Sequence, residues 1–411
     1  MAKVGCIASL IGVFLLQAFT MEGQIDFSIE SPITYHGNQI TPLGFSESAS
    51  GDIDGDGDID LIVTGGDVNG PISTTVYIND GNANFTVKPS NLLAVNSGTV
   101  ELLDIDLDGD LDLFILGQIY SGESASRYYL NDGSGNFPIP QVVLDFNGYE
   151  YLIGGMADFT GDGFPDIFYC GLESFGGEEF SAAYVNDQVG GFTFAPGFSN
   201  VWFSEGRLLL EDLTGNGKAD LIISGYNAGS YKTIFYETDS NSFNPVKTFD
   251  GYTDYVHISA GDIEKNGNKE VVITGDNNGT KATHIFRTTA QNINNYNQEE
   301  SFITGVSNGV SRIVPFTGWE DTYQLFIMGY TGDSSVAEFY DFEGEFFSEI
   351  SALNGLLDGV SAGDAEFADF DGNGELDMFI TGYNSVNDSI ADFYFNYKTG
   401  LDPVVYKNQK P

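Results

Sequence analysis

Aspartates recur at every second position in short segments of this sequence. In one segment, Asp104, Asp106, Asp108 and Asp112 occupy the first, third, fifth and ninth positions, and Gly109 occupies the sixth. Hard cations such as Ca²⁺ take about six to eight oxygen ligands, and alternate residues of a tightly turned loop can direct carboxylates inward. The pattern therefore predicts a calcium loop, in which the glycine permits the turn and the seventh residue supplies its backbone carbonyl.

The same pattern recurs along the chain at a nearly constant spacing. Five copies, beginning at residues 52, 104, 158, 212 and 369, align without gaps. A weaker copy begins at residue 262, and a copy beginning at residue 316 has lost its carboxylates. Seven copies of one unit therefore fill the chain, which is the sequence signature of a repeat architecture.

The odd-numbered positions of six copies are the predicted metal ligands. In chain order they are Asp52, Asp54, Asp56, Asp58, Asp60, Asp104, Asp106, Asp108, Asp110, Asp112, Asp158, Thr160, Asp162, Phe164, Asp166, Asp212, Thr214, Asn216, Lys218, Asp220, Asp262, Glu264, Asn266, Asn268, Glu270, Asp369, Asp371, Asn373, Glu375 and Asp377. The first two copies carry the most carboxylates. In the copy at Asp262, two glutamates replace aspartates and Lys265 adds a positive charge. We therefore expect five calcium sites and leave a sixth, at Asp262, open.

Two other interpretations of these loops fit the sequence less well. The EF-hand opens with the same alternation, but it needs a bidentate glutamate at its twelfth position and a helix afterwards. The twelfth residues here are apolar, as in Val63 and Ile115. Plain Asp-Gly turns with solvated carboxylates are the second alternative, and the repetition of one spacing in register disfavours it.

Each unit also carries the signature of a β-hairpin. An aromatic residue stands two positions before a polar turn and another follows it, as in Tyr77, then Asn79, Asp80 and Gly81, then Phe85. Gly and Asn tolerate the positive φ that tight hairpin turns require. The apolar run after each Asp loop suits a strand covered on both faces. Four strands per unit and seven units predict an all-β fold, a seven-bladed β-propeller of four-stranded antiparallel blades.

The closure of the predicted ring depends on where the last blade finds its fourth strand. The last copy ends after its third strand, and residues 25–32 resemble the fourth-strand pattern of residues 85–89. We therefore predict that the N-terminal strand closes the ring. The alternative is a strand from Pro403 to Tyr406.

The succession of strand, Asp loop, apolar strand and glycine resembles the FG-GAP or VCBS repeat, in segments such as residues 52–65 and 104–117. That family includes the ligand-binding propeller of integrin α subunits and many secreted bacterial proteins. The resemblance implies a seven-bladed propeller with Ca²⁺ between the first and second strands of a blade. The copy at Phe316 departs from the pattern, so no metal is expected there.

The N-terminal residues and the net charge limit where the protein can be located and which partners it can have. An uncharged apolar run from Val4 to Phe19 predicts a signal peptide over residues 1–23, followed by the propeller over residues 24–411. We expect a secreted, extracellular or periplasmic protein with no membrane span in its mature chain. The mature chain has one cysteine, Cys170, so no internal disulfide can form. With 60 acidic and 15 basic residues the formal net charge is −45, which disfavours nucleic-acid partners.

A binding function is favoured over catalysis. The three histidines, His36, His257 and His284, lie in no catalytic motif, and Cys170 is expected to be packed in a core strand. The repeat explains the acidic residues, so a polysaccharide lyase or hydrolase is the alternative rather than the prediction. We expect a monomeric adhesion scaffold for an extracellular protein or glycan. Its binding face would lie opposite the Asp loops and carry the aromatic residues Tyr120, Phe175, Trp202, Tyr226, Tyr330 and Tyr383.

Overall fold

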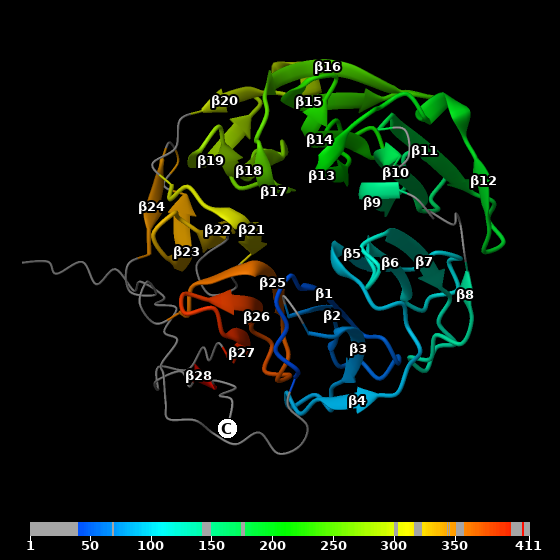
Figure 1. Ribbon diagram of the computed structural model, residues 1–411, viewed down its shortest axis with the longest axis vertical. Coiled ribbons are helices and arrows are strands. Elements are labelled where there is room, and N and C mark those ends of the chain that lie inside the picture. The colour runs from blue at the N-terminus through cyan, green and yellow to red at the C-terminus, as the bar shows by residue number, and fades with distance from the viewer. Residues whose placement is uncertain are drawn as a thin grey trace, which may run out of the picture.

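Seven antiparallel sheets of four strands each stand in a ring in the computed structural model of the chain (Figure 1). The structure describes residues 40–67, 70–141, 149–173, 177–299, 303–315, 323–342, 344, 346–350, 357–395 and 405–406. Within every sheet the strands follow chain order from the centre of the ring outward. The predicted seven-bladed all-β propeller is confirmed.

The blades are numbered here in chain order, and each is built from a continuous stretch of chain. Their strands are β1 (Glu47–Gly51), β2 (Asp60–Gly66), β3 (Ile72–Ile78) and β4 (Thr86–Lys88); β5 (Asn96–Leu103), β6 (Asp112–Gln118), β7 (Ser124–Tyr129) and β8 (Pro140–Gln141); β9 (Tyr149–Ala157), β10 (Asp166–Glu173), β11 (Glu179–Asn186) and β12 (Phe192–Phe194); β13 (Ser204–Glu211), β14 (Asp220–Asn227), β15 (Ser230–Thr238) and β16 (Phe243–Asp250); β17 (Asp254–Gly261), β18 (Glu270–Asn277), β19 (Thr280–Arg287) and β20 (Asn297–Glu299); β21 (Ser307–Pro315), β22 (Tyr323–Tyr330), β23 (Ser335–Phe342) and β24 (Phe347–Glu349); β25 (Val360–Ala368), β26 (Asp377–Asn384), β27 (Ser389–Tyr394) and β28 (Val405–Tyr406). Two single-turn 3₁₀ helices, η1 (Pro196–Phe198) and η2 (Ile293–Asn295), are the helices of the described residues.

The hydrophobic core lies between neighbouring blades. The second strand of a blade is buried along most of its length, and in β2 every residue is buried. Side chains on its two faces enter two different core clusters: Leu61 and Val63 pack with the seventh blade, whereas Ile62 packs with the second. The continuous apolar run that the sequence shows is therefore explained by cover on both faces.

The outer hairpin of each blade is longer than a tight turn. In the first blade β3 ends at Ile78 and β4 begins at Thr86. The Asp80 carboxylate accepts hydrogen bonds from the backbone N–H of Asn82, at 3.0 Å, and from Asn84 Nδ2, at 3.1 Å. The predicted hairpins are present. The one between β3 and β4 is shaped by hydrogen bonds to the Asp80 side chain within the turn, as in an Asx-turn.

The last blade takes its fourth strand from the C-terminal end of the chain. β28 pairs with β27 through Phe393 opposite Tyr406 and Tyr394 opposite Val405. The prediction that the N-terminal strand closes the ring was wrong, because β28 fills the place beside β27. Residues 25–32 themselves lie outside the described residues.

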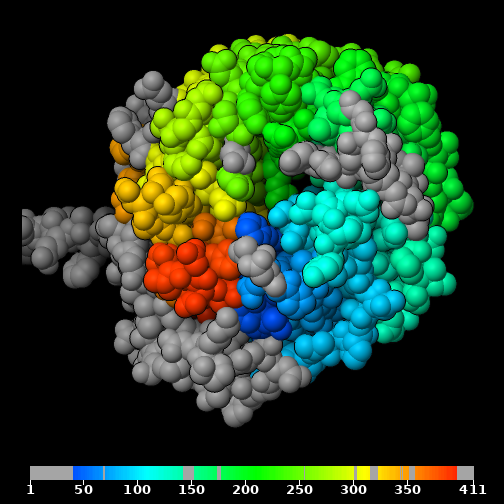
Figure 2. Space-filling model, in the orientation of Figure 1, coloured from blue at the N-terminus to red at the C-terminus, as the bar shows by residue number. Residues whose placement is uncertain are grey.

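Packing between the first and last blades closes the ring. In Figure 2 the blue first blade lies against the orange and red last blade. Tyr77 and Phe85 of the first blade share a core with Phe379 and Phe393 of the last. The backbone N–H of Ser48 on β1 also donates to Asp364 Oδ2 on β25, at 3.0 Å. Among the described residues the junction therefore depends on side chains and loops, and no strand of that part of the chain crosses from one blade to the other.

An asparagine at the end of the third strand joins a blade to its predecessor. Asn131 Nδ2 donates to the carbonyl of Leu111 in its own blade, at 3.0 Å, and to that of Ile53 in the first blade, at 2.7 Å. Asn79 and Asn186 make the same contact with the preceding blade, through the carbonyls of Phe370 and Ile105. The accepting residue is the second residue of an Asp loop, so the shape of each such loop bears on the neighbouring blade.

Candidate metal sites

The predicted ligands lie in the loops between the first and second strands, all at one end of the ring. Positions are counted from one to nine within each loop, starting at Asp52 in the first blade. Positions four and six adopt left-handed backbone conformations, as in Gly55 (φ 75°) and Gly57 (φ 96°). Leu107 (φ 57°) and Lys265 (φ 53°) adopt this conformation at position four despite having side chains. The two left-handed residues turn the loop back on itself and bring its odd positions together.

The position-one aspartate shapes the loop by accepting backbone hydrogen bonds. Asp52 Oδ1 accepts from the N–H groups of Gly55 and Asp56, at 2.8 and 3.1 Å, and Oδ2 accepts from that of Gly57, at 3.0 Å. Asp158 and Asp212 bond their loops in the same way. This side chain thus has a structural role whether or not a metal is bound.

The position-nine acid is buried and ties the loop to the hairpin. Asp60 Oδ2 accepts from the N–H of Ile53, at 2.9 Å, and Oδ1 accepts from that of Asn79, at 2.8 Å. Burial raises the pKa of Asp60 to about 6 although these hydrogen bonds lower it. The pKa values of Asp112, Asp166 and Asp220 are raised to about 6 by burial as well. A nearby cation would stabilise the charged form of these carboxyl groups.

The position-three aspartates point most directly to a ligand. Asp54 Oδ1 and Asp106 Oδ1 are buried and have no hydrogen-bond partner. Burial, followed by the charges of Asp56 and Asp108 respectively, raises the pKa values of these two carboxyl groups. A buried acceptor without a partner is costly, so this position fits a cation that bonds directly to oxygen.

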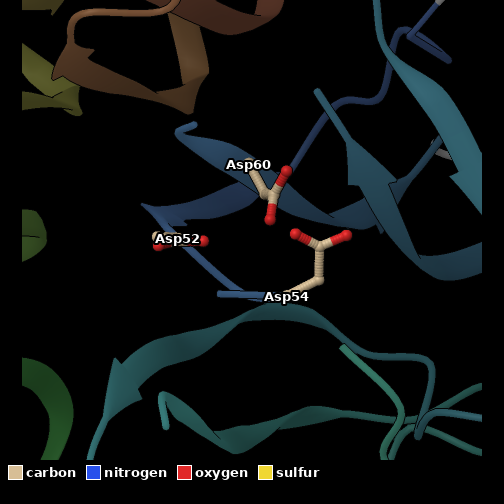
Figure 3. Close-up of side chains that lie close together, drawn as sticks. All are labelled: Asp52, Asp54 and Asp60. Carbon is tan, nitrogen blue, oxygen red and sulfur yellow. The ribbon is translucent and has the colours of Figure 1, made fainter. Parts of the chain in front are cut away.

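Carboxylate oxygens converge in three of the loops. In each case one oxygen from every acid lies within 4.8 Å of the others, in the groups Asp52, Asp54 and Asp60; Asp104, Asp106 and Asp108; and Asp369, Asp371 and Asp377. Figure 3 shows the carboxyl groups of Asp54 and Asp60 facing one another beside Asp52. Oxygens on opposite sides of a Ca²⁺ ion are about 4.6 to 5.2 Å apart, twice the Ca–O distance. The oxygens in these loops of blades one, two and seven therefore have spacings that fit a calcium ion.

Position seven contributes no side chain to the cluster in the first two blades. A Cβ on Gly81 would lie 2.5 Å from the Asp58 carboxylate, and a Cβ on Gly133 would lie 2.5 Å from that of Asp110. Both aspartates thus extend toward the outer hairpin of their own blade. Only their backbone carbonyls remain as candidate ligands, which accounts for the varied residues at position seven.

The loops of blades three and four contain fewer acids. Asp162 at position five accepts a hydrogen bond from Gln188 Nε2, at 3.1 Å, in addition to its backbone contact. Thr160 and Thr214 supply hydroxyl oxygens at position three. Neutral oxygens bind calcium more weakly than carboxylates, so we rank these two sites below those of blades one, two and seven.

The loops of blades five and six differ from the rest. In blade five, Glu264 forms an ion pair with Arg287, with 3.3 Å between Oε1 and Nε. In blade six, residues 316–322 lie outside the described residues. The described residue at position nine is Gln324, a neutral side chain that is fully buried and donates to Asp341 Oδ1, at 2.9 Å.

The cysteine, two of the histidines and Tyr383 are packed or hydrogen-bonded within the fold. Cys170 is buried in the core between blades three and four, where burial raises the pKa of its thiol. His284 Nδ1 lies 2.5 Å from the Tyr252 hydroxyl, and His257 lies among the inner strands beside Arg312. Tyr383 packs edge-on against Phe45 at the junction of blades seven and one. His36 and Phe175 lie outside the described residues.

The predicted binding face carries exposed aromatic residues. Tyr120 is 87 % exposed, Trp202 54 % and Tyr330 39 %. Asn227 Nδ2 donates to the carbonyl of Trp202, at 2.6 Å, which holds the backbone beside the indole. Tyr226 packs edge-on against Tyr231. This face lies opposite the Asp loops, because it is formed by the connections at the other ends of the same strands.

Comparison with known proteins agrees with the fold. Residues 52–115 and 104–169 match the family model of the FG-GAP-like repeat. The BP39L lectin from Burkholderia pseudomallei superposes with a TM-score of 0.56 at 12 % identity, over 89 % of this chain and 99 % of the lectin. At this identity the likeness concerns the fold alone. No curated protein sequence matched the chain.

Two further structures are similar at lower scores. The rhamnogalacturonan lyase PL11 of Bacillus licheniformis has a TM-score of 0.46 at 12 % identity, over 93 % of this chain and 77 % of the lyase. The six-bladed Aleuria aurantia lectin has a TM-score of 0.37 at 10 % identity, over 74 % of this chain and 94 % of the lectin.

Proposed function

The chain is a seven-bladed β-propeller with FG-GAP-like repeats, and we propose that it is a secreted, non-catalytic binding scaffold braced by Ca²⁺ in five of its loops. The observation that supports the metal is the pair of buried oxygens without partners, Asp54 Oδ1 and Asp106 Oδ1, each within a group of converging carboxylates. Bound Ca²⁺ would supply the positive charge that these groups lack.

Each of the five loops would hold the ion through the side chains of positions one, three, five and nine and the carbonyl of position seven. Positions one and nine are already oriented by backbone hydrogen bonds, as in Asp52 and Asp60. Little rearrangement is then needed on binding, which limits the entropic cost of ordering the loop. The fold thus orients most of the ligands before metal binds. The carboxylate at position three, which has an oxygen without a hydrogen-bond partner, is the group that a bound cation would stabilise most.

Replacing the position-three acid tests the metal proposal. We expect Asp54→Asn and Asp106→Asn each to lower the Ca²⁺ bound per chain, or to weaken one site by at least about tenfold, because a neutral amide replaces a charged ligand. Asp67→Asn, which removes a carboxylate from the opposite side of the first blade, should leave binding unchanged. Isothermal titration of Ca²⁺ into metal-stripped protein gives both quantities. Retention of every site in both position-three variants would contradict the proposal.

We propose that the ligand is an extracellular protein or glycan. It would bind to the face opposite the Asp loops, where Tyr120, Trp202 and Tyr330 are exposed. Exposed aromatic side chains on connecting loops provide large contact areas at low entropic cost, and the rigid blades fix their positions. BP39L, a lectin, shares the fold, which makes glycans a suitable class of probe.

Binding assays on Trp202→Ala test this face. A glycan array and a pull-down from extracellular material, each with and without Ca²⁺, should show a ligand whose binding falls at least about tenfold in the variant, the loss expected of a central aromatic contact. Asn244→Ala, at an exposed position on β16, serves as the control. Equal binding by Trp202→Ala would place the site elsewhere, and cleavage products from a polysaccharide panel would show an enzyme instead.

Secretion remains a prediction from the sequence. The proposed signal peptide, residues 1–23, lies outside the described residues. Among the residues that the structure does describe, no helix has the length and apolar character needed to span a bilayer. Cys170, the one cysteine of the described residues, is buried and free, which fits an extracellular protein stabilised by metal rather than by disulfides.

A further inference from the structure

An arginine engages the position-three acid of blade five. Arg287, the last residue of β19, places Nε 3.3 Å from Glu264 Oε1 and Nη1 3.0 Å from Glu299 Oε2. Asn266 Nδ2 donates to the other oxygen of Glu264, at 2.8 Å. Glu264 thus accepts one hydrogen bond and forms an ion pair, although Arg287 Nε donates no hydrogen bond, whereas Oδ1 of the equivalent Asp54 has no hydrogen-bond partner.

The arginine stands where the first three blades have apolar residues. In each blade an aromatic residue of the third strand lies opposite the first apolar residue of the second strand, as Phe286 lies opposite Val271. The next residue is Arg287 in blade five. In blades one, two and three the residues at this position are Ile78, Leu130 and Val185, which pack partly buried against core clusters. An arginine at this position of the third strand is thus particular to blade five among these four blades.

The blade-five loop carries less negative charge than the loop of the first blade. It has three acids, Asp262, Glu264 and Glu270, and two lysines, Lys265 and Lys269, of which Lys269 pairs with Glu211 of blade four. The first blade places five aspartates between residues 52 and 60, with no basic residue within that stretch. A divalent cation brought to the blade-five loop would meet a fixed guanidinium and fewer carboxylates than in the first blade.

Arg287 also connects blade five to blade six. Its guanidinium carbon lies 5.0 Å from the centre of the Phe342 ring and 5.8 Å from that of Phe347. The side chain is 16 % exposed, so these cation–π contacts are largely shielded from water. The loop of blade five is therefore held, and joined to the next blade, by protein groups.

We propose that Arg287 excludes Ca²⁺ from the loop of blade five and replaces it as the cation that holds Glu264. This inference depends on the proposed calcium sites of the other blades, and it deepens that proposal by identifying the residue that limits their number. The loop retains one metal-directed feature, since Glu270 Oε1 is buried and accepts no hydrogen bond. Removing the guanidinium would free Glu264 beside Asp262, Asn266 and Glu270 and create the ligand set of an ordinary loop.

The main test is the Ca²⁺ stoichiometry of Arg287→Leu, which introduces the residue type found in blade two. By equilibrium dialysis of the full chain, we expect one more Ca²⁺ per chain than in the wild type. Lys269→Leu is the matched control, because Lys269 belongs to the same loop but pairs with Glu211 of blade four. Its stoichiometry should equal that of the wild type. An unchanged stoichiometry in a folded Arg287→Leu variant would overturn the proposal.

A second variant tests the inference if Arg287→Leu does not fold. Glu264→Gln should bind as many Ca²⁺ ions as the wild type, because its loop is expected to bind none, and loss of an ion would overturn the proposal. If the wild type binds no Ca²⁺ at all, the proposed calcium function fails. If the wild type binds Ca²⁺ and the Glu264→Gln variant loses an ion, the calcium function stands and only the proposed role of Arg287 is refuted.

Discussion

Excess chelator is expected to lower the melting temperature of the protein by on the order of 10 °C, and Ca²⁺ is expected to restore it. A site saturated at a hundred times its dissociation constant contributes about 2.7 kcal/mol to the free energy of unfolding. Several such sites add up to a large effect even in a chain of this length. The physical cause is the loss of the cation that separates carboxylates such as Asp52, Asp54 and Asp60.

The effect of chelation should be uneven around the ring. The loops with converging carboxylates belong to blades seven, one and two; blades seven and one meet at the junction that closes the ring, and blade two packs against blade one. Asn79 Nδ2 also bonds the carbonyl of Phe370, so the loop of blade seven contacts the first blade directly. Without metal, we expect hydrogen exchange to accelerate in β2 and β26 before it does in β18.

The control for this prediction is replacement of Ca²⁺ by Mg²⁺. Mg²⁺ demands a smaller and more regular octahedral site and keeps several of its waters, so it should restore less of the melting temperature. A melting curve that chelator leaves unchanged would contradict the metal brace. Uniform acceleration of hydrogen exchange in all blades would agree with stabilisation by metal. It would contradict the prediction that the metal stabilises the ring closure most.

The repeat made the architecture predictable from sequence. Each Asp loop is followed by an apolar strand that is buried on both faces, so the signal is strong and recurs once per blade, as in Leu61 to Val63. The fourth strands carry no such signal. β8 and β28 have two residues each, and β4 is largely exposed. Short edge strands show no apolar alternation, so the choice of residues 25–32 over Pro403 to Tyr406 for the closure depended only on a resemblance to residues 85–89, and it was wrong.

The chemistry within the loops was less predictable than their positions. Spacing treats Asp52, Asp54 and Asp60 alike, whereas the structure occupies the first and last with backbone hydrogen bonds and leaves an oxygen of Asp54 without one. Arg287 comes from a different strand than Glu264, and its contact depends on how the hairpin folds over the loop. The sequence did contain one usable signal for this contact. The residue that follows the aromatic residue of the third strand is apolar in blades one to three, whereas in blade five it is Arg287.

The inner strands hold a charged network that no sequence motif indicates. Arg207 on β13 forms an ion pair with Glu47 on β1. Arg312 on β21 lies 2.6 Å from Asp364 Oδ1, and its Nη1 lies 2.7 Å from His257 Nε2. These partners are far apart in the sequence and meet only because the first strands of all blades gather at the centre of the ring (Figure 1).

The free energy of unfolding of the Ca²⁺-saturated protein is expected to fall by about 3 kcal/mol as pH rises from about 5 to about 7. Burial raises the pKa of Glu47 to about 7, although Arg207 lowers it, and burial raises that of Glu101 to about 7. Burial and the charge of Asp364 raise the pKa of Glu366 as well. The unfolded chain loses these protons near pH 4.5, so in this window the folded state binds more protons and stability declines as pH rises.

One group opposes this trend. Burial, followed by the charges of Arg312 and Arg207, lowers the pKa of His257 well below its ordinary value. Its contribution to stability therefore increases as pH rises through about 6.5, where the unfolded imidazole loses its proton. Three acids act against one histidine, so the decline should prevail.

Glu101→Gln isolates the effect in a single side chain. Glu101 Oε2 accepts a hydrogen bond from the backbone N–H of Met156, at 2.9 Å, and the amide oxygen of glutamine can replace it. Urea unfolding should show the variant more stable than the wild type at pH 8, by about 1 kcal/mol or more, and equally stable at about pH 3.5 and below, where the wild-type acid is protonated in both states. Glu178→Gln, at an exposed position, should change neither value. Parallel pH profiles for Glu101→Gln and the wild type would show that Glu101 is ionised in the folded protein, and that the inner strands tolerate its charge.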